Sequence, residues 1–549
     1  MFETLDTIKR DWVEEHFAQM TTEEKLGQMI CERHPDLKKV EDLETWCNKY
    51  PIGSLFVGAE IIDPFAKQAD GESVIVKTIN DTGKIPLLLC GDFEWGIGDN
   101  IKGFTRLPNM MALGATRDPE LAFQYGQVIA EEASYLDIRW SLSPVADVNM
   151  NRENPVTNIR SVSDNPDLII ELLKSEIKGM QAGGCAACLK HFPGDGSDNR
   201  NQHYVTSFNV LSKEEWDGNH GKVFKQLIDA GAMSVMIGHI AFPDYEPMNE
   251  DKGKFRPATT SYRLMTELLR EELGFKGIIV TDALCMAGFH VWAEYRERML
   301  DAFNAGTDIF LWPETEKFYE LMIPALHDGR ASMDRLNESV RRILSFKALL
   351  GLDGSCEPKV KEIPHSVLQT NSDVAEKVAA QSITLLRNNN NNLPLKLNPG
   401  ARVLMLVTPE KEVAMRPLEE FANEFIARGY EVTFAKFSDF RTWEKTVDIF
   451  DLVMLLCNAS PRYVEHRGFN MAIWPFVSNV KMKQTVVISF GSPYFLYDVA
   501  ADTYVNAYSD SPASIKMTVQ SLFGEIPFQG RSPVSVENCF AFGDGIITK

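Results

Sequence analysis

Short apolar runs alternate with amphipathic helical patterns between about residues 20 and 350 of the chain. The runs that predict strands are residues 52–57, 86–90, 141–145, 186–191, 234–240, 277–282 and 307–312. Helical periodicity lies between them, at residues 121–135, 168–180, 212–228, 262–273 and 292–304. Repeated strand–helix units indicate parallel strands with helical crossovers, and about seven or eight of them favour a closed (β/α)8-type TIM barrel. An open doubly wound sheet is the alternative, because periodicity alone does not separate the two.

The pattern changes near residue 350, where a segment with Gly and Pro reads as a linker. Residues 374–386 form a further helix or strand, and five asparagines, Asn388 to Asn392, follow as an expected exposed loop. A second alternating series predicts strands at residues 403–407, 432–435, 452–457, 486–490 and 503–507. The α/β chain is therefore expected to hold a TIM-barrel catalytic domain at 1–352, a linker and connecting segment at 353–400, and a smaller open α/β sandwich domain at 401–549.

Composition narrows the class of protein. The 549 residues are 44% hydrophobic and 24% charged, as in a soluble globular protein, and this length favours two domains. No apolar run approaches the roughly 20 residues that span a bilayer. The first residues lack a basic segment followed by an apolar one, so a cytoplasmic protein is expected. The net charge of −21 argues against a nucleic-acid partner.

The nine cysteines are scattered along the chain, which fits reduced thiols. Cys185 and Cys188 have the spacing of a redox motif, but they lie in a run of small residues and are interpreted as buried strand cysteines. The second series of strands has no Gly-x-Gly-x-x-Gly and no Walker-type loop, so nucleotide binding, which its architecture alone would allow, is disfavoured.

Polar side chains follow several of the expected strands. Lys190-His191-Phe192-Pro193-Gly194-Asp195-Gly196 is followed closely by Asn201-Gln202-His203, and Asp282 ends the apolar run that begins at Gly277. Catalytic groups of TIM barrels lie on loops after the strands' carboxyl ends, and His191, His239 and Asp282 fall at such positions. From the residues alone, Asp282 is either a carboxylate nucleophile or the cap of the next helix.

These segments resemble glycoside hydrolase family 3, in the branch that uses a histidine as acid/base and contains β-N-acetylglucosaminidases, β-glucosidases and β-glycoside phosphorylases. The further segments that carry the resemblance, in order, are Asp92-Phe93-Glu94-Trp95-Gly96, Gly103-Phe104-Thr105-Arg106-Leu107-Pro108, Ser143-Pro144-Val145-Ala146-Asp147-Val148-Asn149, Asn158-Ile159-Arg160-Ser161, Ala305-Gly306-Thr307-Asp308, Ser382-Ile383-Thr384-Leu385-Leu386 and Gly491-Ser492-Pro493-Tyr494. Their order and spacing make the resemblance specific.

The resemblance implies a retaining enzyme acting on gluco-configured β-glycosides, either β-glucosides or β-N-acetylglucosaminides, through a covalent glycosyl-aspartate. In that reading Asp282 is the nucleophile and His203 the acid/base. A histidine suits this role because its pKa lies near neutrality. The substrate-binding positions are Asp92, Arg160, Lys190, His191 and Asn201. The resemblance implies no metal and no organic cofactor.

One position departs from the family pattern: Asn201 stands where these enzymes usually carry an Asp two residues before the catalytic His. Asparagine can orient an imidazole but brings no negative charge. Asp195 and Asp198 are candidate replacements for the carboxylate. Without that negative charge the site repels an anion less, so inorganic phosphate is a candidate co-substrate beside water. The alternative function is a catalytically silent sugar-binding homologue.

Two further positions leave questions open. Asn100 stands where related sequences often carry an Arg eight residues after the Asp, which puts one sugar contact in question. In some two-domain relatives the second domain supplies the acid. Glu465, in the polar stretch after Cys457, is the residue here that could substitute for His203 in that way.

Overall fold

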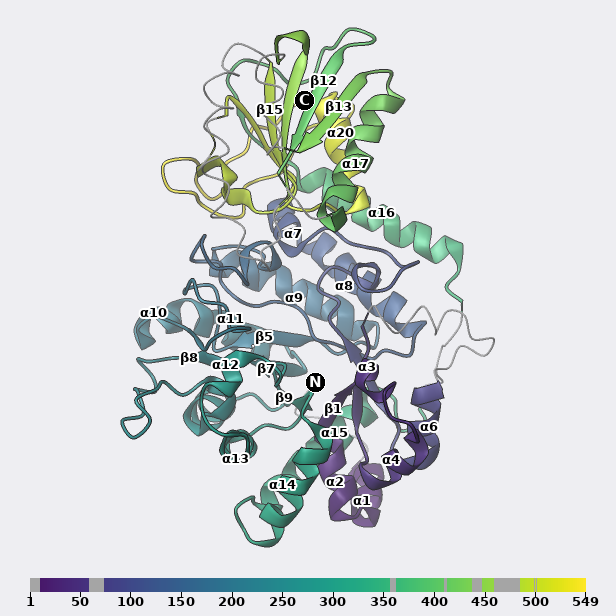
Figure 1. Ribbon diagram of the computed structural model, residues 1–549, viewed down its shortest axis with the longest axis vertical. Helices are drawn as coiled ribbons and strands as arrows, with labels where there is room; N and C mark the ends of the chain where they lie inside the picture. Colours follow the sequence, from purple (N-terminus) through teal and green to yellow (C-terminus); the bar gives the residue numbers. More distant parts are fainter. Residues whose placement is uncertain are drawn as a thin grey trace. The chain divides into compact units, whose positions relative to one another are not determined.

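The computed structural model describes residues 10–58, 74–355, 362–408, 412–436, 447–458, 484–497, 499 and 501–549 (Figure 1). Its contacts divide the chain into two compact units. The first unit contains residues 1–105, 123–151 and 173–368, and the second contains residues 106–122, 152–172 and 369–549. Two segments from within the expected first domain, 106–122 and 152–172, therefore group with the second unit.

Among the described residues, eight parallel strands form the framework of the first unit. They are β1 (Ile30–Arg33), β2 (Ser54–Phe56), β3 (Leu88–Gly91), β4 (Trp140–Ser141), β5 (Cys188–Phe192), β7 (Ser234–Ile237), β9 (Ile278–Thr281) and β10 (Phe310–Leu311). One sheet has the order β10-β1-β2-β3-β4 and another the order β5-β7-β9. Parallel bridges from Trp140 to Ala186 and from Val280 to Ile309 join the two sheets at both edges. The strands thus close into a ring, which confirms the expected barrel over the open sheet.

Strand β1 is the barrel strand that the sequence pattern did not predict. Its four residues, Ile30-Cys31-Glu32-Arg33, contain only two apolar side chains, so no apolar run marks it. Glu32 is nevertheless buried, with only 6% of its surface exposed. Burial raises the pKa of Glu32 to about 7, against opposing hydrogen bonds from Thr315 and Arg33. A buried carboxyl group at this position breaks the hydrophobic pattern.

Helices connect the barrel strands. They include α8 (Pro119–Ser134), α9 (Pro166–Ala182), α10 (Lys213–Gly218), α11 (His220–Asp229), the π-helix η5 (Arg263–Glu272), α13 (Tyr295–Ala305), α14 (Thr315–His327) and α15 (Met333–Leu349). The helix expected at residues 212–228 is in fact two helices, because the backbone of Asn219 leaves the helical region. A capping box at Ser212 and Glu215 starts the first of them.

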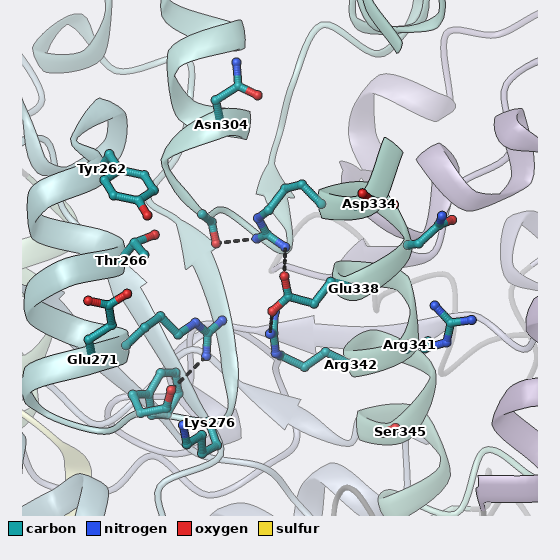
Figure 2. A pocket seen from close by; sticks show the side chains of 15 residues that line it. Tyr262, Thr266, Glu271, Lys276, Asn304, Asp334, Glu338, Arg341, Arg342 and Ser345 are labelled. Atoms are coloured by element: carbon teal, nitrogen blue, oxygen red, sulfur yellow. Dashed lines mark hydrogen bonds and ion pairs between the residues drawn. The ribbon is translucent and has the colours of Figure 1, made fainter. Parts of the chain in front are cut away.

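A buried carboxylate ties three elements together at the amino end of β10. Asp308 is fully buried and accepts hydrogen bonds from Arg270 Nη2 at 2.5 Å, Arg342 Nη1 at 2.6 Å and Arg335 Nη2 at 3.2 Å. All three arginines line a cavity of about 830 Å³, and Figure 2 shows Arg342 at this cavity, beside Glu338. Glu338 also pairs with two of them, at 4.0 Å from Arg335 Nη1 and 2.5 Å from Arg342 Nη2. The cluster holds the two helices against the strand.

The second unit contains a six-stranded sheet with the order β11-β16-β15-β14-β12-β13. The strands are β11 (Thr384–Asn388), β12 (Arg402–Val407), β13 (Glu431–Lys436), β14 (Leu452–Cys457), β15 (Thr485–Ser489) and β16 (Thr503–Asn506), and only β11 runs antiparallel to its neighbour. Helix α17 (Glu412–Ala427) packs on β12 and β13, and α20 (Pro512–Leu522) packs on α17 (Figure 1). This is the expected open α/β sandwich. The segment expected as a helix or strand is both, since α16 (His365–Ser382) leads into β11.

Apolar side chains from distant parts of the sequence form the core of the second unit. Met111, Ala112 and Ala115 of α7 (Met110–Thr116), with Ile159, pack into one cluster with residues of the sheet such as Leu404. The structure thus builds this core partly from residues that precede the sheet by more than 200 positions. None of the helices in the described parts of the chain is long and apolar enough to cross a bilayer.

Candidate active site

Asp282 follows β9 directly, at the carboxyl end of a barrel strand. Its backbone N–H donates to Ile237 O at 2.9 Å, and its Oδ1 accepts from Ala283 N at 2.7 Å. Only 9% of the residue is exposed. Burial by itself raises the pKa of the carboxyl group. The imidazoles of His191 and His239, the Ala283 N–H and His203 together outweigh that effect, and the pKa of Asp282 lies below its ordinary value. Asp282 is therefore held as a carboxylate.

His203 is oriented by Asn201. The side-chain oxygen Asn201 Oδ1 accepts from His203 Nδ1 at 2.7 Å and from His203 N at 2.9 Å. Because an amide oxygen can only accept, Nδ1 carries the hydrogen, and Nε2 is the nitrogen that exchanges a proton. Asn201 thus provides the orientation that a carboxylate would give, without its charge.

The loop that carries His203 is docked on the segment that follows Asp282. The backbone N–H groups of Ala287 and Gly288, in the short helix α12 (Ala287–His290), donate to His203 O at 3.1 Å and Gln202 O at 3.2 Å. The Thr206 hydroxyl donates to Gly288 O at 2.9 Å. The first unit therefore brings the two expected catalytic residues onto segments that are hydrogen-bonded to each other.

Lys190 lies on β5 with its ammonium group between two carboxylates. Its Nζ is 2.8 Å from Asp92 Oδ1 and 2.7 Å from Glu94 Oε1. The side chains of Lys190 and Glu94 are 2% and 5% exposed, whereas that of Asp92 is 39% exposed. Asp92 is thus the member of the trio that faces solvent. The Asn100 amide group, in place of the usual arginine, donates to the backbone oxygen Asp92 O.

Glu94 was not identified as a site residue from the sequence. The sequence signal that could have identified Glu94 is its two-residue spacing from Asp92 after β3, which places both carboxylates on the same side of the chain.

Glu176 of α9 lies behind Glu94; it is fully buried and has no hydrogen-bond partner for either carboxyl oxygen among the described residues. Burial, and then the neighbouring Glu94, raise the pKa of Glu176 to about 8. Glu176 is therefore a neutral acid at physiological pH.

His191 is fixed by Asp147, another residue with no role assigned from the sequence. His191 Nδ1 donates to Asp147 Oδ2 at 2.8 Å, and His191 N donates to Asp147 Oδ1 at 3.0 Å. Asp147 is fully buried. Burial opposes its ionisation, but the charge and hydrogen bonds of His191 and the Asp195 N–H prevail and keep the pKa of Asp147 below its ordinary value. The opposite ring nitrogen, Nε2, is the one available to a ligand.

Asp195 and Asp198, the two candidate substitutes for the missing carboxylate, support the loop. Asp195 is 1% exposed; its oxygens accept from Gly196 N at 2.7 Å and Gln202 Nε2 at 3.4 Å. Asp198 accepts from Phe208 N at 3.0 Å. These bonds hold the shape of the loop, whereas the hydrogen bond that orients His203 is the one that its Nδ1 donates to Asn201 Oδ1.

The other residues singled out in the sequence are Arg160, Glu465 and the two cysteines Cys185 and Cys188. Arg160 belongs to the second unit, where it is 7% exposed and its Nη1 donates to Val156 O at 3.1 Å. Glu465 lies outside the described residues. Cys185 and Cys188 are buried thiols, as expected, and burial raises the pKa of each to about 12.

The chain is similar to known carbohydrate-processing proteins over nearly its full length. The model of the glycosyl hydrolase family 3 N-terminal domain matches residues 21–346. A β-N-acetylglucosaminidase/β-glucosidase of Cellulomonas fimi is 32% identical, over 97% of this chain and 96% of that protein. β-Hexosaminidase A of Pseudoalteromonas piscicida is 29% identical, over 68% of this chain and 65% of that protein.

Solved structures agree with these relatives. A β-glucoside phosphorylase, BglX, bound to 2FGlc, is 27% identical and superposes with a TM-score of 0.83 over 97% of this chain and 99% of its own. A family 3 β-N-acetylglucosaminidase from Paenibacillus sp. str. FPU-7 is 25% identical, with a TM-score of 0.83 over 94% of this chain and 99% of its own. The family model covers more than half of the chain and the Cellulomonas fimi protein nearly all of it, so the chain belongs to glycoside hydrolase family 3 and is an enzyme of that family.

Proposed function

We propose that the protein is a retaining β-glycosidase that works at the mouth of the barrel, with Asp282 as nucleophile. A retaining mechanism needs a carboxylate that attacks the anomeric carbon C1 and an acid that protonates the departing oxygen. Asp282 supports the first role, because it is buried and its pKa is depressed, so it is ionised and poorly solvated. In the first step an Asp282 oxygen bonds to C1 as the bond between C1 and the leaving-group oxygen breaks.

His203 is the proposed acid. Its Nδ1–H is engaged by Asn201, so the proton that protonates the leaving oxygen comes from Nε2. The sugar-binding group is proposed to comprise Asp92, Lys190 and His191. Asp92 accepts from sugar hydroxyls, since it is the exposed partner of the buried Lys190. His191 offers Nε2, since Asp147 occupies Nδ1.

Phosphate is the proposed acceptor for the second step. A phosphate oxygen attacks C1 from the side vacated by the leaving group, the ester bond to Asp282 breaks, and His203 regains a proton from the phosphate monoanion or from solvent. Two displacements each invert C1, so the sugar 1-phosphate keeps the β configuration. The observation that carries this choice is the 2.7 Å bond from His203 Nδ1 to the neutral Asn201.

The reason for proposing phosphate as the acceptor is electrostatic. A carboxylate at position 201 would raise the basicity of His203 and help it activate water, and it would also repel an incoming anion. Asparagine removes both effects while it keeps the imidazole oriented. The likeness to the β-glucoside phosphorylase BglX supports the same choice, and with the Cellulomonas fimi relative it supports β-glucosides and β-N-acetylglucosaminides as the substrates to test.

The test is turnover of nitrophenyl β-glucoside and β-N-acetylglucosaminide with and without inorganic phosphate, with products identified by ³¹P and ¹H NMR. A rate that rises with phosphate and yields a β-sugar 1-phosphate is expected. Release of free sugar at a rate indifferent to phosphate would leave a retaining hydrolase. Failure of a fluorinated glycoside to label Asp282, together with no turnover, would point to the silent sugar-binding homologue.

A further inference from the structure

Gln202 is the buried residue of a loop whose next residues are open to solvent. It is fully buried, whereas Tyr204 and Val205 are 64% and 40% exposed. A cavity of about 890 Å³ borders the loop at Val205, Thr206 and Phe208. The loop therefore has little packing on that side, and its position near His203 depends on the contacts that Gln202 makes on the buried side.

The Gln202 side chain connects the loop to β7 and to the preceding turn. Its Oε1 accepts from the backbone N–H of His239 at 2.8 Å, and its Nε2 donates to Asp195 Oδ2 at 3.4 Å. Space around it is tight. A Cβ added to Gly238 would lie 3.1 Å from Gln202 Oε1, and one added to Gly288 would lie 2.4 Å from Gln202 O. Because Gly238 and Gly288 have no Cβ, their backbones can lie this close to Gln202, and the tight packing restricts Gln202 to one position.

His239 extends this connection to the segment of Asp282. It is fully buried, and its Nε2 donates to Ala283 O at 3.1 Å, since a carbonyl oxygen can only accept. Its Nδ1 pairs with Thr259 Oγ1 at 2.7 Å, and the Phe289 ring lies 5.4 Å from the imidazole. Burial lowers the pKa of His239, against the opposing charge of Asp282, and the imidazole acts as a hydrogen-bonding link between the two segments.

We propose that Gln202 and His239 are positioning residues that fix the His203 loop against the strand end of Asp282. The connection runs from Gln202 Oε1 through the backbone and imidazole of His239 to the carbonyl of Ala283, the residue after Asp282. It thereby sets the separation between the proton donor and the nucleophile. This inference rests on the proposed function, in which His203 is the acid.

The first test compares leaving groups. Phenol departs only with help from an acid, whereas dinitrophenolate departs without it, so misplacing His203 penalises the phenyl glycoside alone. Gln202→Met keeps the size of the side chain but removes its acceptor. It is expected to lower kcat/KM on phenyl β-glucoside about 100-fold and to leave the dinitrophenyl substrate nearly unaffected. Equal losses on both substrates, or no loss on either, would overturn the role of Gln202.

A matched control exists at the other end of β7. Gln181 makes the same kind of contacts, since its Oε1 accepts from Met233 N at 3.1 Å and its Nε2 donates to Gly231 O at 2.9 Å. Gln181→Met should leave kcat/KM on both substrates unchanged.

A second variant covers the case in which Gln202→Met fails to fold. Gln202→Glu at mildly acidic pH retains an acceptor for His239 N and shares a proton with Asp195, and it should keep the wild-type ratio of the two rates. A collapsed ratio in that variant would count against the proposal.

The second test addresses the nucleophile. His239→Phe removes the bond to Ala283 O and should slow inactivation by a dinitrophenyl 2-fluoroglucoside, a reaction that needs Asp282 but no acid. Gln202→Met should leave that inactivation rate unchanged. Wild-type inactivation of His239→Phe would overturn the role of His239.

His203→Ala separates failure of this inference from failure of the proposed function. If His203→Ala shows the leaving-group dependence and Gln202→Met does not, only the positioning role fails. If His203→Ala lacks the dependence, His203 is not the acid, and both proposals fall.

Discussion

At the scale of single residues, the proposed choice of phosphate as acceptor rests on one atom pair, Asn201 Oδ1 and His203 Nδ1, 2.7 Å apart. The two residues are fixed by their shared loop, and Asn201 also accepts from the His203 backbone. A change of Asn201 to the isosteric aspartate alters the charge at this point and little else. Position 201 is therefore where the choice of acceptor can be tested with the smallest structural change.

Asn201→Asp is expected to shift turnover toward hydrolysis. The added carboxylate raises the pKa of His203 and repels phosphate, so the alkaline limb of the pH–rate profile should move upward and the share of sugar 1-phosphate should fall, by about tenfold. Product ratios at fixed phosphate concentration measure the effect. An unchanged ratio with a shifted pH profile would mean that His203 is the titrating acid but that acceptor choice is made elsewhere.

At the scale of secondary-structure elements, the cluster around Asp308 joins η5, α15 and the start of β10. Both carboxyl oxygens of Asp308 are occupied: Oδ2 by Arg270 and the Ile279 N–H, and Oδ1 by Arg335, Arg342 and Ser339. Burial opposes ionisation of Asp308, but the three guanidinium groups prevail and hold its pKa far below the ordinary value. Removing this carboxylate takes away the ion-pair partner of Arg270 and leaves Arg335 and Arg342 with Glu338 alone as their counter-charge.

Asp308→Asn is expected to lower the free energy of unfolding by about 3 to 5 kcal/mol at neutral pH. Because the folded pKa is depressed, the contribution of Asp308 is present above the pKa of the unfolded chain and is lost as pH falls below it. The variant and the wild type should therefore converge in acid. Urea titrations at several pH values measure the difference. A gap that persists unchanged into strong acid would contradict the ionic account.

At the scale of the whole molecule, stability in alkali should depend on the buried acid Glu176. Its folded pKa is raised from 4.5 to about 8, so the folded state holds a proton that the unfolded state has released over that window. By linkage, this group lowers the stability of the fold as pH rises from 4.5 toward 8. Ionisation would also place a second negative charge behind Glu94 and Lys190.

Glu176→Gln removes this titration and is expected to make the protein more stable than the wild type above neutrality, by an amount on the order of 3 kcal/mol, with little difference near pH 4. Thermal unfolding followed across this pH range measures the effect. Gln181→Met, on the same helix, is the control for a change at α9 that removes no charge. Parallel pH curves for Glu176→Gln and the wild type would show that Glu176 does not titrate there.

Much of the barrel could be predicted from the sequence, because parallel strands buried on both faces appear as uninterrupted apolar runs. The strand β1 could not, since Glu32 interrupts its pattern. The motif around Lys190, His191 and Asp282 indicated the candidate site, because strand ends carry the catalytic groups of this fold. Glu94, Asp147 and Gln202 were missed because their importance lies in contacts with residues far away in the sequence, which no local pattern records.

The interleaving of the two units has a consequence for the order in which the protein can be made. Residues 106–122 and 152–172 leave the ribosome early, but the core that covers Met111, Ala112, Ala115 and Ile159 needs strands that begin after residue 400. During synthesis these apolar side chains have no partners from their own sheet until about the last quarter of the chain has been made. The second unit therefore cannot finish folding until the chain is almost complete. If synthesis stopped at the linker, the apolar side chains of residues 106–122 and 152–172 would stay uncovered.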